Sequence, residues 1–157
     1  MRDFACTPNP IGMFLLNNNI ESLAVRMDRH CENALKVAQF LEADDRISWV
    51  NYPMLPSNPD YALAQKYLPK GASGVVSFGV KGGREAAQSF MGKLKIAAIE
   101  THVADARSCC LHPASTTHRQ MSDEELANAG VPSDLVRLSV GLEDADDLIA
   151  DIEQALN

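Results

Sequence analysis

The chain has 157 residues, a length typical of one domain, and 46% of them are hydrophobic, so a packed core is feasible. Its net charge of -7 argues against a general nucleic-acid binder, because such proteins need a basic face. No stretch approaches the ~20 consecutive apolar residues of a membrane span. The start, Met1-Arg2-Asp3, lacks the apolar segment of a secretion signal.

The spacing of the cysteines forms neither a CxxC pair nor a disulfide framework. Reduced thiols are the simplest interpretation, and they predict a cytoplasmic protein. Two of the cysteines are adjacent in a predicted strand, so their side chains should point to opposite faces of a sheet. The four are Cys6, Cys31 and the adjacent pair Cys109 and Cys110.

Apolar residues at helical spacing predict that residues 11–42 are mostly helical. The three asparagines at 17–19 are expected to interrupt this helix and to cap its restart. Asp44 and Asp45 close the segment. We therefore expect residues 1–45 to form a long linking helical segment and residues 46–157 to form an α+β subdomain.

The rest of the chain alternates between strands and short helices. Alternating or β-branched residues predict strands at 47–52, 74–80, 108–111 and 135–141, with a short strand at 96–99. Helices are predicted at 59–67, at 84–94, from the Ser122–Glu125 capping box to Gly130, and from Asp144 or Asp146 to the end. The last helix carries an apolar stripe of Leu148, Ile149, Ile152 and Leu156.

The connections between these elements are short, whereas parallel strands usually need crossovers of about a dozen residues or more. We therefore predict an α+β fold with a mostly antiparallel four-stranded sheet, helices on one face and a long N-terminal helix. No internal repeat or low-complexity tract interrupts this order.

Arg137 is the most informative residue, because it is a permanent cation in the middle of an apolar strand. Alternation places Val136, Leu138 and Val140 on one face and Leu135, Arg137 and Ser139 on the other. Such a cation is costly to desolvate unless an anion meets it, and its planar fork fits a carboxylate. Two interpretations stay open: an internal pair with Asp or Glu, and an anchor for a small carboxylate ligand.

Polar segments flank the 108–111 strand. In the first, His102 can titrate near neutrality and contact a ligand, or it can be a loop histidine bonded to the backbone. In the second, His112 and His118 match no standard zinc spacing with the nearby cysteines, so we predict no metal site. A structural loop whose hydroxyls cap backbone amides is the better interpretation of residues 112–118.

Five segments carry a family resemblance, of which HPASTTH and VRLSVG are specific in combination. The segments are RMDRHCENA (26–34), WVNYP (49–53), GVVSFGVKGG (74–83), HPASTTH (112–118) and LVRLSVGLED (135–144). Together they resemble the C-terminal part of the Cys/Met-metabolism enzymes that use pyridoxal phosphate, and within that family the O-acetylhomoserine sulfhydrylases most closely. The likeness covers essentially all 157 residues, in order.

The resemblance implies the C-terminal subdomain of a fold-type I enzyme. Such transferases replace the acetoxy group of O-acetylhomoserine with sulfide or a thiol, through chemistry that the cofactor supplies. In that family the arginine matching Arg137 holds the substrate α-carboxylate, and the loop matching His102 and Val103 lies beside it. We therefore expect Arg137, His102 and Val103 to bind substrate, although many relatives carry Ser or Asn at the position of His102.

The family's large N-terminal domain, which holds the Schiff-base lysine, has no counterpart in this chain. The resemblance therefore implies a chain without catalytic residues of its own, inactive alone, whose partners are the missing pyridoxal phosphate domain, an amino-acid substrate and further copies in a homo-oligomer. The alternative is a non-catalytic α+β interaction module or one half of a split enzyme. Much of the choice among sulfhydrylase, γ-lyase and cystathionine synthase chemistry belongs to the absent domain.

Overall fold

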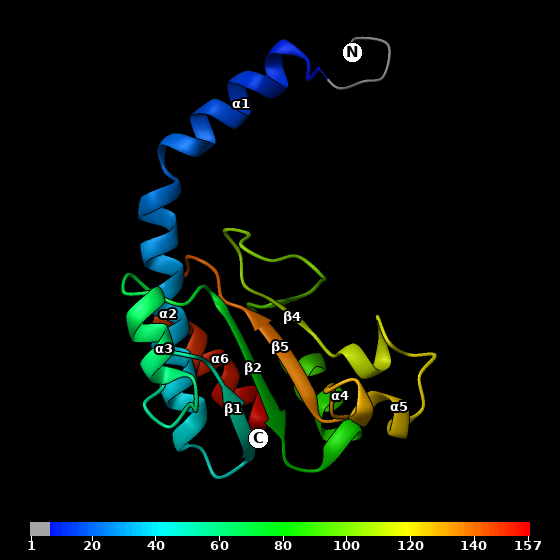
Figure 1. Ribbon diagram of the computed structural model, residues 1–157. Coiled ribbons are helices and arrows are strands. Elements are labelled where there is room, and N and C mark those ends of the chain that lie inside the picture. Colours follow the sequence, from blue (N-terminus) through cyan, green and yellow to red (C-terminus); the bar gives the residue numbers. More distant parts are fainter. Residues whose placement is uncertain (1–6) are drawn as a thin grey trace.

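The computed structural model describes residues 7–157, so Cys6 lies outside the described range. Figure 1 shows a body built from a sheet and helices, from which the first helix projects. In chain order the elements are α1 (Pro10–Glu21), α2 (Leu23–Ala43), β1 (Ile47–Asn51), α3 (Tyr61–Tyr67), β2 (Val75–Val80), α4 (Gly83–Lys93), β3 (Ala98–Ile99), β4 (Cys109–Leu111), the 3-10 helix η2 (Pro113–Ser115), α5 (Asp123–Asn128), β5 (Leu135–Ser139) and α6 (Ala145–Leu156). Within the described range, no helix combines the length and apolar character that a membrane span needs.

The N-terminal helical segment consists of two helices that meet at Ser22. The prediction that residues 17–19 interrupt the helix was wrong, because all three asparagines are helical. The Asn19 side chain donates to the Leu15 carbonyl at 2.8 Å, so its amide is satisfied within the helix. The break lies at Ser22 instead, where Arg26 Nη2 donates to the Asn19 carbonyl at 2.8 Å and satisfies a helix-end acceptor.

The sheet has five strands in the order β1-β2-β5-β4-β3. Three neighbouring pairs are antiparallel, and β3 pairs with β4 in parallel. The sheet is therefore mixed, and the prediction of a mostly antiparallel four-stranded sheet was wrong in strand number and at this edge. Because β3 contains only two residues, the loop of residues 100–108 is enough to return the chain to the start of β4 without a helical crossover.

Helices α2, α4 and α6 pack against one face of the sheet, which lies in front of them in Figure 1. We call this the covered face and the opposite one the open face. Val76, Phe78 and Leu138 lie on the covered face and belong to the core. The Phe78 ring meets Phe90 of α4 edge to face, with 5.7 Å between ring centroids. The predicted alternation of β5 is confirmed, because Val136 and Leu138 enter the core while Arg137 does not.

Several local predictions are also confirmed. The capping box forms at the start of α5, with Ser122 accepting from the Glu125 N–H and Glu125 accepting from the Ser122 N–H. Asp144 caps α6, whose Leu148 and Ile152 are buried against the core. The three cysteines within the described range, Cys31, Cys109 and Cys110, are free thiols.

Candidate functional site

Arg137 lies at the centre of the open face. β5 is the middle strand of the sheet, and the Cα of Arg137 pairs with Ser77 of β2 on one side and Leu111 of β4 on the other. The side chain is half-buried. The same alternation that sends Val136 and Leu138 into the core turns Arg137 toward the open face.

The guanidinium of Arg137 has no carboxylate partner among residues 7–157. Nη2 donates to the Thr101 carbonyl at 2.8 Å. Nε is buried and has no hydrogen-bond partner within the described range. The internal pair with Asp or Glu, one of the two interpretations of this residue, is therefore not what the structure contains. One neutral acceptor leaves most of the five guanidinium donors available to a ligand.

A loop of residues 100–108 lies against this part of the open face. The Ala104 N–H donates to Ser139 Oγ at 3.2 Å, and Cys109 Sγ contacts the His102 carbonyl at 3.1 Å. Together with the contact from Arg137 to Thr101, these bonds attach the middle of the loop to β4 and β5. Ala104 adopts a left-handed backbone with a φ of 58°, which costs energy in any residue with a Cβ.

Two residues predicted to bind substrate, His102 and Val103, lie in this loop next to Thr101. Both are exposed, and 55% of Val103 is accessible. The His102 ring reaches back along the chain, with Nδ1 at 3.0 Å from Oε2 of Glu100. Thus Arg137 contacts the Thr101 carbonyl, and the side chains of the two residues that flank Thr101 contact each other. The roles of His102 and Val103 toward a substrate stay predictions.

Cys109 lies beneath this loop, and nearby charged groups change the pKa of its thiol. Burial raises its pKa, the hydrogen bond with Ser139 lowers it, Glu100 and Asp105 raise it, and Arg137 lowers it. Its neighbour Cys110 faces the core, as the alternation predicted, and burial raises the pKa of that thiol to about 12. Both thiols are accordingly protonated at neutral pH.

The far end of the loop is attached by Glu143. Its carboxylate accepts from the Ser108 N–H at 2.6 Å and from Ser108 Oγ at 2.9 Å. The same hydroxyl accepts from the Gly141 N–H at 2.8 Å. A Cβ on Gly141 would lie 2.5 Å from the Ser108 nitrogen, so no larger residue fits there. The loop is thus held to the sheet at both its middle and its end.

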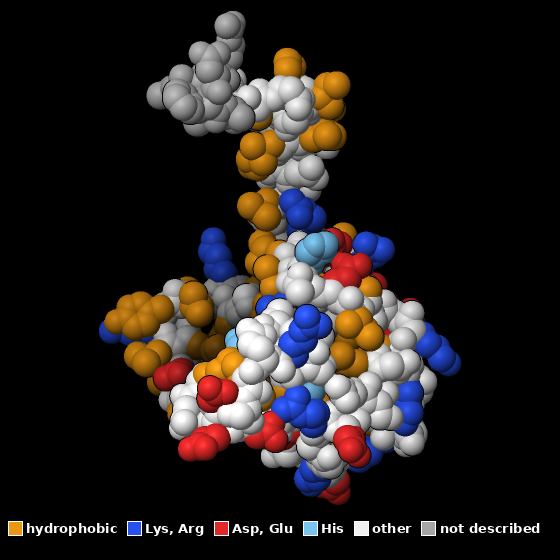
Figure 2. Space-filling view, turned by 90° about the vertical axis from the view of Figure 1, so that its right-hand side faces the viewer, with side chains coloured by type: hydrophobic (Ala, Val, Ile, Leu, Met, Phe, Trp, Pro, Cys, Tyr) orange, Lys and Arg blue, Asp and Glu red, His pale blue; other side chains and the backbone are white. Residues whose placement is uncertain are grey.

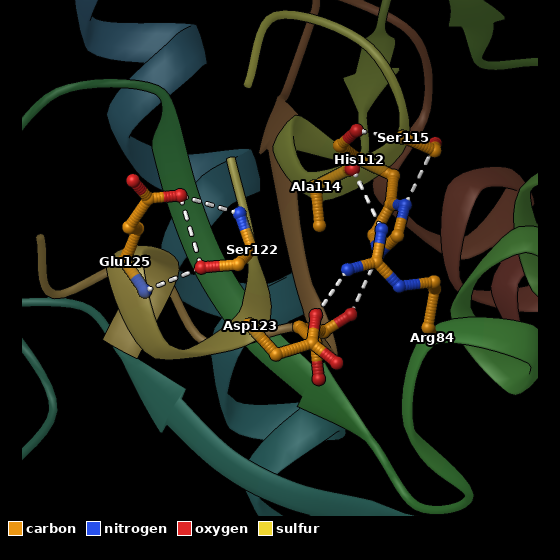
Figure 3. Close-up of polar contacts among 8 residues, drawn as sticks. Arg84, His112, Ala114, Ser115, Ser122, Asp123 and Glu125 are labelled. Carbon is orange, nitrogen blue, oxygen red and sulfur yellow. Dashed lines mark hydrogen bonds and ion pairs between the residues drawn. The ribbon is translucent and has the colours of Figure 1, made fainter. Parts of the chain in front are cut away.

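The HPASTTH segment after β4 is a structural connection, as Figure 3 shows. His112 Nε2 donates to the Ser133 carbonyl at 2.8 Å, and its Nδ1 lies 2.8 Å from Ser115 Oγ. Thr116 Oγ1 donates to the His112 carbonyl at 2.8 Å. The hydroxyls therefore bond a ring and a carbonyl, whereas backbone amides were predicted as their partners. Both ring nitrogens of His112 are in use, and no metal-binding group of three or more side chains occurs within residues 7–157.

Arg84 of α4 fastens this segment to the two helices beside it. Its Nη1 donates to the Ala114 carbonyl at 2.7 Å, and its Nη2 pairs with the carboxylate of Asp123 at the start of α5 (Figure 3). Leu111, the last residue of β4, pairs with Arg137. The segment therefore fixes the end of the strand that lies next to the candidate site.

The six lysines offer no site for a covalently bound cofactor. All six side chains are exposed, and they lie on helices or in turns rather than on the open face strands: Lys36, Lys66, Lys70, Lys81, Lys93 and Lys95. Lys36 pairs with Glu32, and Lys81 donates to the Asp45 carbonyl. A nucleophilic lysine is instead activated by a desolvating or cationic pocket. The residues present fit the binding of a carboxylate and not the attachment of an aldehyde.

Sequence reasoning missed three residues of the site. Glu100 and Ser139 bond the loop or its histidine, and Cys109 lies beneath them. Alternation had placed Ser139 on the same face as Arg137, so the sequence could have predicted that Ser139 belongs to the site. No residue pattern marks Glu100, although its partner His102 is only two residues away in the chain.

Comparison with known proteins gives a consistent result. The family model for the Cys/Met metabolism PLP-dependent enzyme matches residues 1–157. The chain is 45% identical to a homocysteine synthase from Schizosaccharomyces pombe and 44% identical to an O-acetyl-L-homoserine sulfhydrylase from Leptospira meyeri. Each match covers 99% of this chain and 36% of the relative, so the chain spans a little over a third of their length.

A solved structure agrees with these relatives. An O-acetylhomoserine (thiol)-lyase from Campylobacter jejuni, described with N'-pyridoxyl-lysine-5'-monophosphate, superposes with a TM-score of 0.89 at 44% identity. The match covers 99% of this chain and 37% of that protein. The resemblance inferred from the five sequence segments is thereby confirmed, as is the dependence of the family on pyridoxal phosphate.

Proposed function

Because the chain belongs to the family of Cys/Met metabolism PLP-dependent enzymes, we propose that it forms the C-terminal part of an O-acetylhomoserine sulfhydrylase-like enzyme. In this proposal the substrate is an amino acid such as O-acetylhomoserine, and the chain binds its α-carboxylate. The complete protein is a cytoplasmic homo-oligomer with an N-terminal cofactor domain. That cofactor, when bound, supplies the stabilisation of the substrate carbanion.

The proposal rests on the position of Arg137, its partial burial and its hydrogen-bond partners. A guanidinium on an open sheet face, half-buried and without an acidic partner in the described range, is suited to an external carboxylate. Ser77, Leu111 and the 100–108 loop border it, so the anion would dock between the loop and the strands. Val103 supplies an apolar side chain at this border, and His102 supplies a second polar contact.

The placement of the lysines supports the view that this chain is inactive alone. With no buried lysine, the chain has no group activated to form an aldimine with the cofactor. We expect pyridoxal phosphate mixed with the isolated chain to give no stoichiometric aldimine absorbance. Reduction with borohydride that fixed the cofactor to one lysine would contradict this expectation.

Helix α1 supports the existence of a further domain in the functional protein. None of its residues is buried, and Ile11, Phe14 and Ile20 are each more than half exposed. Figure 2 shows hydrophobic side chains along the projecting column that α1 forms. Several large apolar side chains exposed together normally mark a surface that another part of the protein covers. We propose that the N-terminal domain covers α1, and that in its absence the isolated chain self-associates, which sedimentation velocity would detect as the loss of a monomer.

The decisive experiment measures substrate-analogue binding after the missing part is supplied in trans from the S. pombe homocysteine synthase, with assembly checked first by cofactor absorbance. Arg137→Ala should weaken binding by roughly 2–5 kcal/mol, because a buried charge-assisted contact is lost. Arg137→Lys keeps the charge without the fork and should recover only part of the affinity.

Arg107→Ala provides the matched control. Arg107 lies in the same loop, but it is exposed and its nearest acid is Asp105, 4.0 Å away. Its removal should leave affinity nearly unchanged. Equal affinities for the wild type and Arg137→Ala would remove Arg137 from the binding site. A chain that assembled with no other protein and bound no amino acid would favour the interaction-module alternative.

A further inference from the structure

Helix α2 binds the β5–α6 turn, the segment between those two elements, through two buried side chains. His30 Nδ1 donates to the Val140 carbonyl at 2.7 Å. Asn33 Nδ2 donates to the Gly141 carbonyl at 3.1 Å and to the Glu143 carbonyl at 2.7 Å. His30 is 2% exposed and Asn33 is 1% exposed. Because carbonyl oxygens only accept, the atoms that face this turn must be N–H donors.

Asn33 is suited to its position because a primary amide carries two hydrogens on one nitrogen. One hydrogen can bond each carbonyl, so a single buried side chain satisfies two acceptors of the same turn. The Asn33 Oδ1 has no hydrogen-bond partner within the described range, so the amide acts here as a donor. An apolar side chain would leave both carbonyls without this donor, which is costly in a buried place.

The same turn is bonded to the far end of the β3–β4 loop, which is the loop of residues 100–108. The Glu143 carboxylate accepts from the Ser108 N–H at 2.6 Å, and the Gly141 N–H donates to the Ser108 hydroxyl at 2.8 Å. Ser108 is fully buried. Gly141 and Glu143 therefore each bond α2 with their carbonyl and the loop with another group.

The near end of the β3–β4 loop orients the proposed carboxylate anchor. Residues 101–104 are exposed, and β5 holds them through two hydrogen bonds. Arg137 Nη2 donates to the Thr101 carbonyl at 2.8 Å, and the Ala104 N–H donates to Ser139 Oγ at 3.2 Å. Because one arm of the guanidinium is bonded to this loop, the position of the loop determines where the remaining donors of Arg137 point.

We propose that Asn33 and Glu143 are positioning residues for carboxylate binding, because they connect α2 through the β5–α6 turn to the loop that orients Arg137. This inference rests on the proposed function of Arg137. Figure 1 shows the turn between α2 and the loop. Helix α2 follows directly on α1, which in our proposal contacts the N-terminal domain. The helical segment that meets that domain therefore also holds the substrate loop in place.

The first test measures hydrogen exchange of the isolated 157-residue chain by mass spectrometry. In Asn33→Leu and in Glu143→Ala, peptides from the β3–β4 loop should exchange about three- to tenfold faster than in the wild type, because hydrogen bonds that hold the loop are lost. Peptides from β2 and β5 should keep their rates. Glu143→Ala keeps both carbonyls that Asn33 binds, and Glu143→Gln keeps an acceptor oxygen and should recover part of the protection.

Tyr52→Phe is the matched control. Tyr52 is also fully buried, and its hydroxyl donates to the Ser73 carbonyl at 3.0 Å and lies 3.4 Å from the Cys31 carbonyl of α2. The substitution removes a buried polar contact of α2 without touching the β5–α6 turn, so the loop should exchange as in the wild type. If Asn33→Leu does not fold, Asn33→Ser replaces it, because one hydroxyl hydrogen cannot bond both carbonyls.

The second test measures acetate binding to the protein assembled with the N-terminal part. The Asn33 variant and Glu143→Ala should bind acetate about three- to tenfold more weakly than the wild type, and Tyr52→Phe should bind it equally well. Unchanged loop exchange or unchanged affinity in both variants, or an equal change in Tyr52→Phe, would overturn the inference. Equal affinities of the wild type and Arg137→Ala would instead overturn the proposed function, on which the exchange experiment does not depend.

Discussion

The two faces of the sheet have opposite properties although the same strands form both. On the covered face, Val76, Phe78 and Leu138 are at most 3% exposed and contact helices. On the open face, Arg137 is half-buried and is held by one bond to a loop carbonyl. Within β5 the two kinds of residue alternate one by one. Stability and the proposed ligand binding are therefore assigned to neighbouring residues of a single strand, and single substitutions should separate them.

The largest difference in the free energy of unfolding is expected between Phe78→Ala and Arg137→Ala. Phe78 is fully buried, so its truncation leaves a cavity and should lower the free energy of unfolding by about 3–5 kcal/mol. Arg137→Ala removes a half-buried side chain whose Nε has no partner in the described range, and should change that free energy by less than about 1 kcal/mol. Urea unfolding followed by circular dichroism measures both, and similar losses would mean that the open face also forms part of the core.

A smaller change in the free energy of unfolding is expected when the contact between Asp44 and Arg46, where α2 joins β1, is removed. Arg46 donates to the Asp44 carboxylate from its backbone N–H, Nε and Nη2, at 2.8, 2.9 and 2.6 Å. The side-chain hydrogen bond from Arg46 holds the pKa of Asp44 below its usual value. A pKa that is lowered by folding contributes stability above the pKa of the unfolded state, and this contribution is lost as the pH falls through the folded-state pKa.

Asp44→Asn should therefore lower the free energy of unfolding by about 1 kcal/mol at neutral pH, a value limited by solvent screening. The difference from the wild type should shrink as the pH falls below about 4. Urea unfolding at several pH values measures it. Asp45→Asn is the control, because Asp45 accepts from Lys81 through its backbone carbonyl, which the substitution keeps, and it should have little effect. A difference that is constant with pH would show that the charge of Asp44 is not involved.

The smallest effect, and the only stabilising one, is expected in the loop of the open face. Ala104 has a φ of 58°, which glycine adopts without strain. Ala104→Gly should raise the free energy of unfolding by about 0.5 kcal/mol, since relief of strain exceeds the added entropy of the unfolded chain. Ala106→Gly, in the same loop but with ordinary φ, should destabilise. If both substitutions destabilise, the left-handed conformation at Ala104 carries no strain.

Local patterns predicted much of the fold. The alternation of β5 correctly separated Arg137 from Val136 and Leu138, and the capping box correctly placed the start of α5. The helix break was predicted at residues 17–19 but lies at Ser22. Asn tends to favour non-helical backbone, but the Asn19 side chain donates to the Leu15 carbonyl within the helix instead. The strand count was too low because the short strand predicted at 96–99 was left out of the four-stranded sheet, whereas its last two residues form β3 and pair with β4.

The order of the residues alone determined most of the strands and helices, which face Arg137 occupies and which family the chain resembles. These properties depend on periodicity and capping between residues that are near each other in the chain. Only the tertiary structure decided that Arg137 meets the Thr101 carbonyl, 36 residues away, instead of an acid. Such contacts depend on how a loop returns across the sheet, and no local spacing specifies that path.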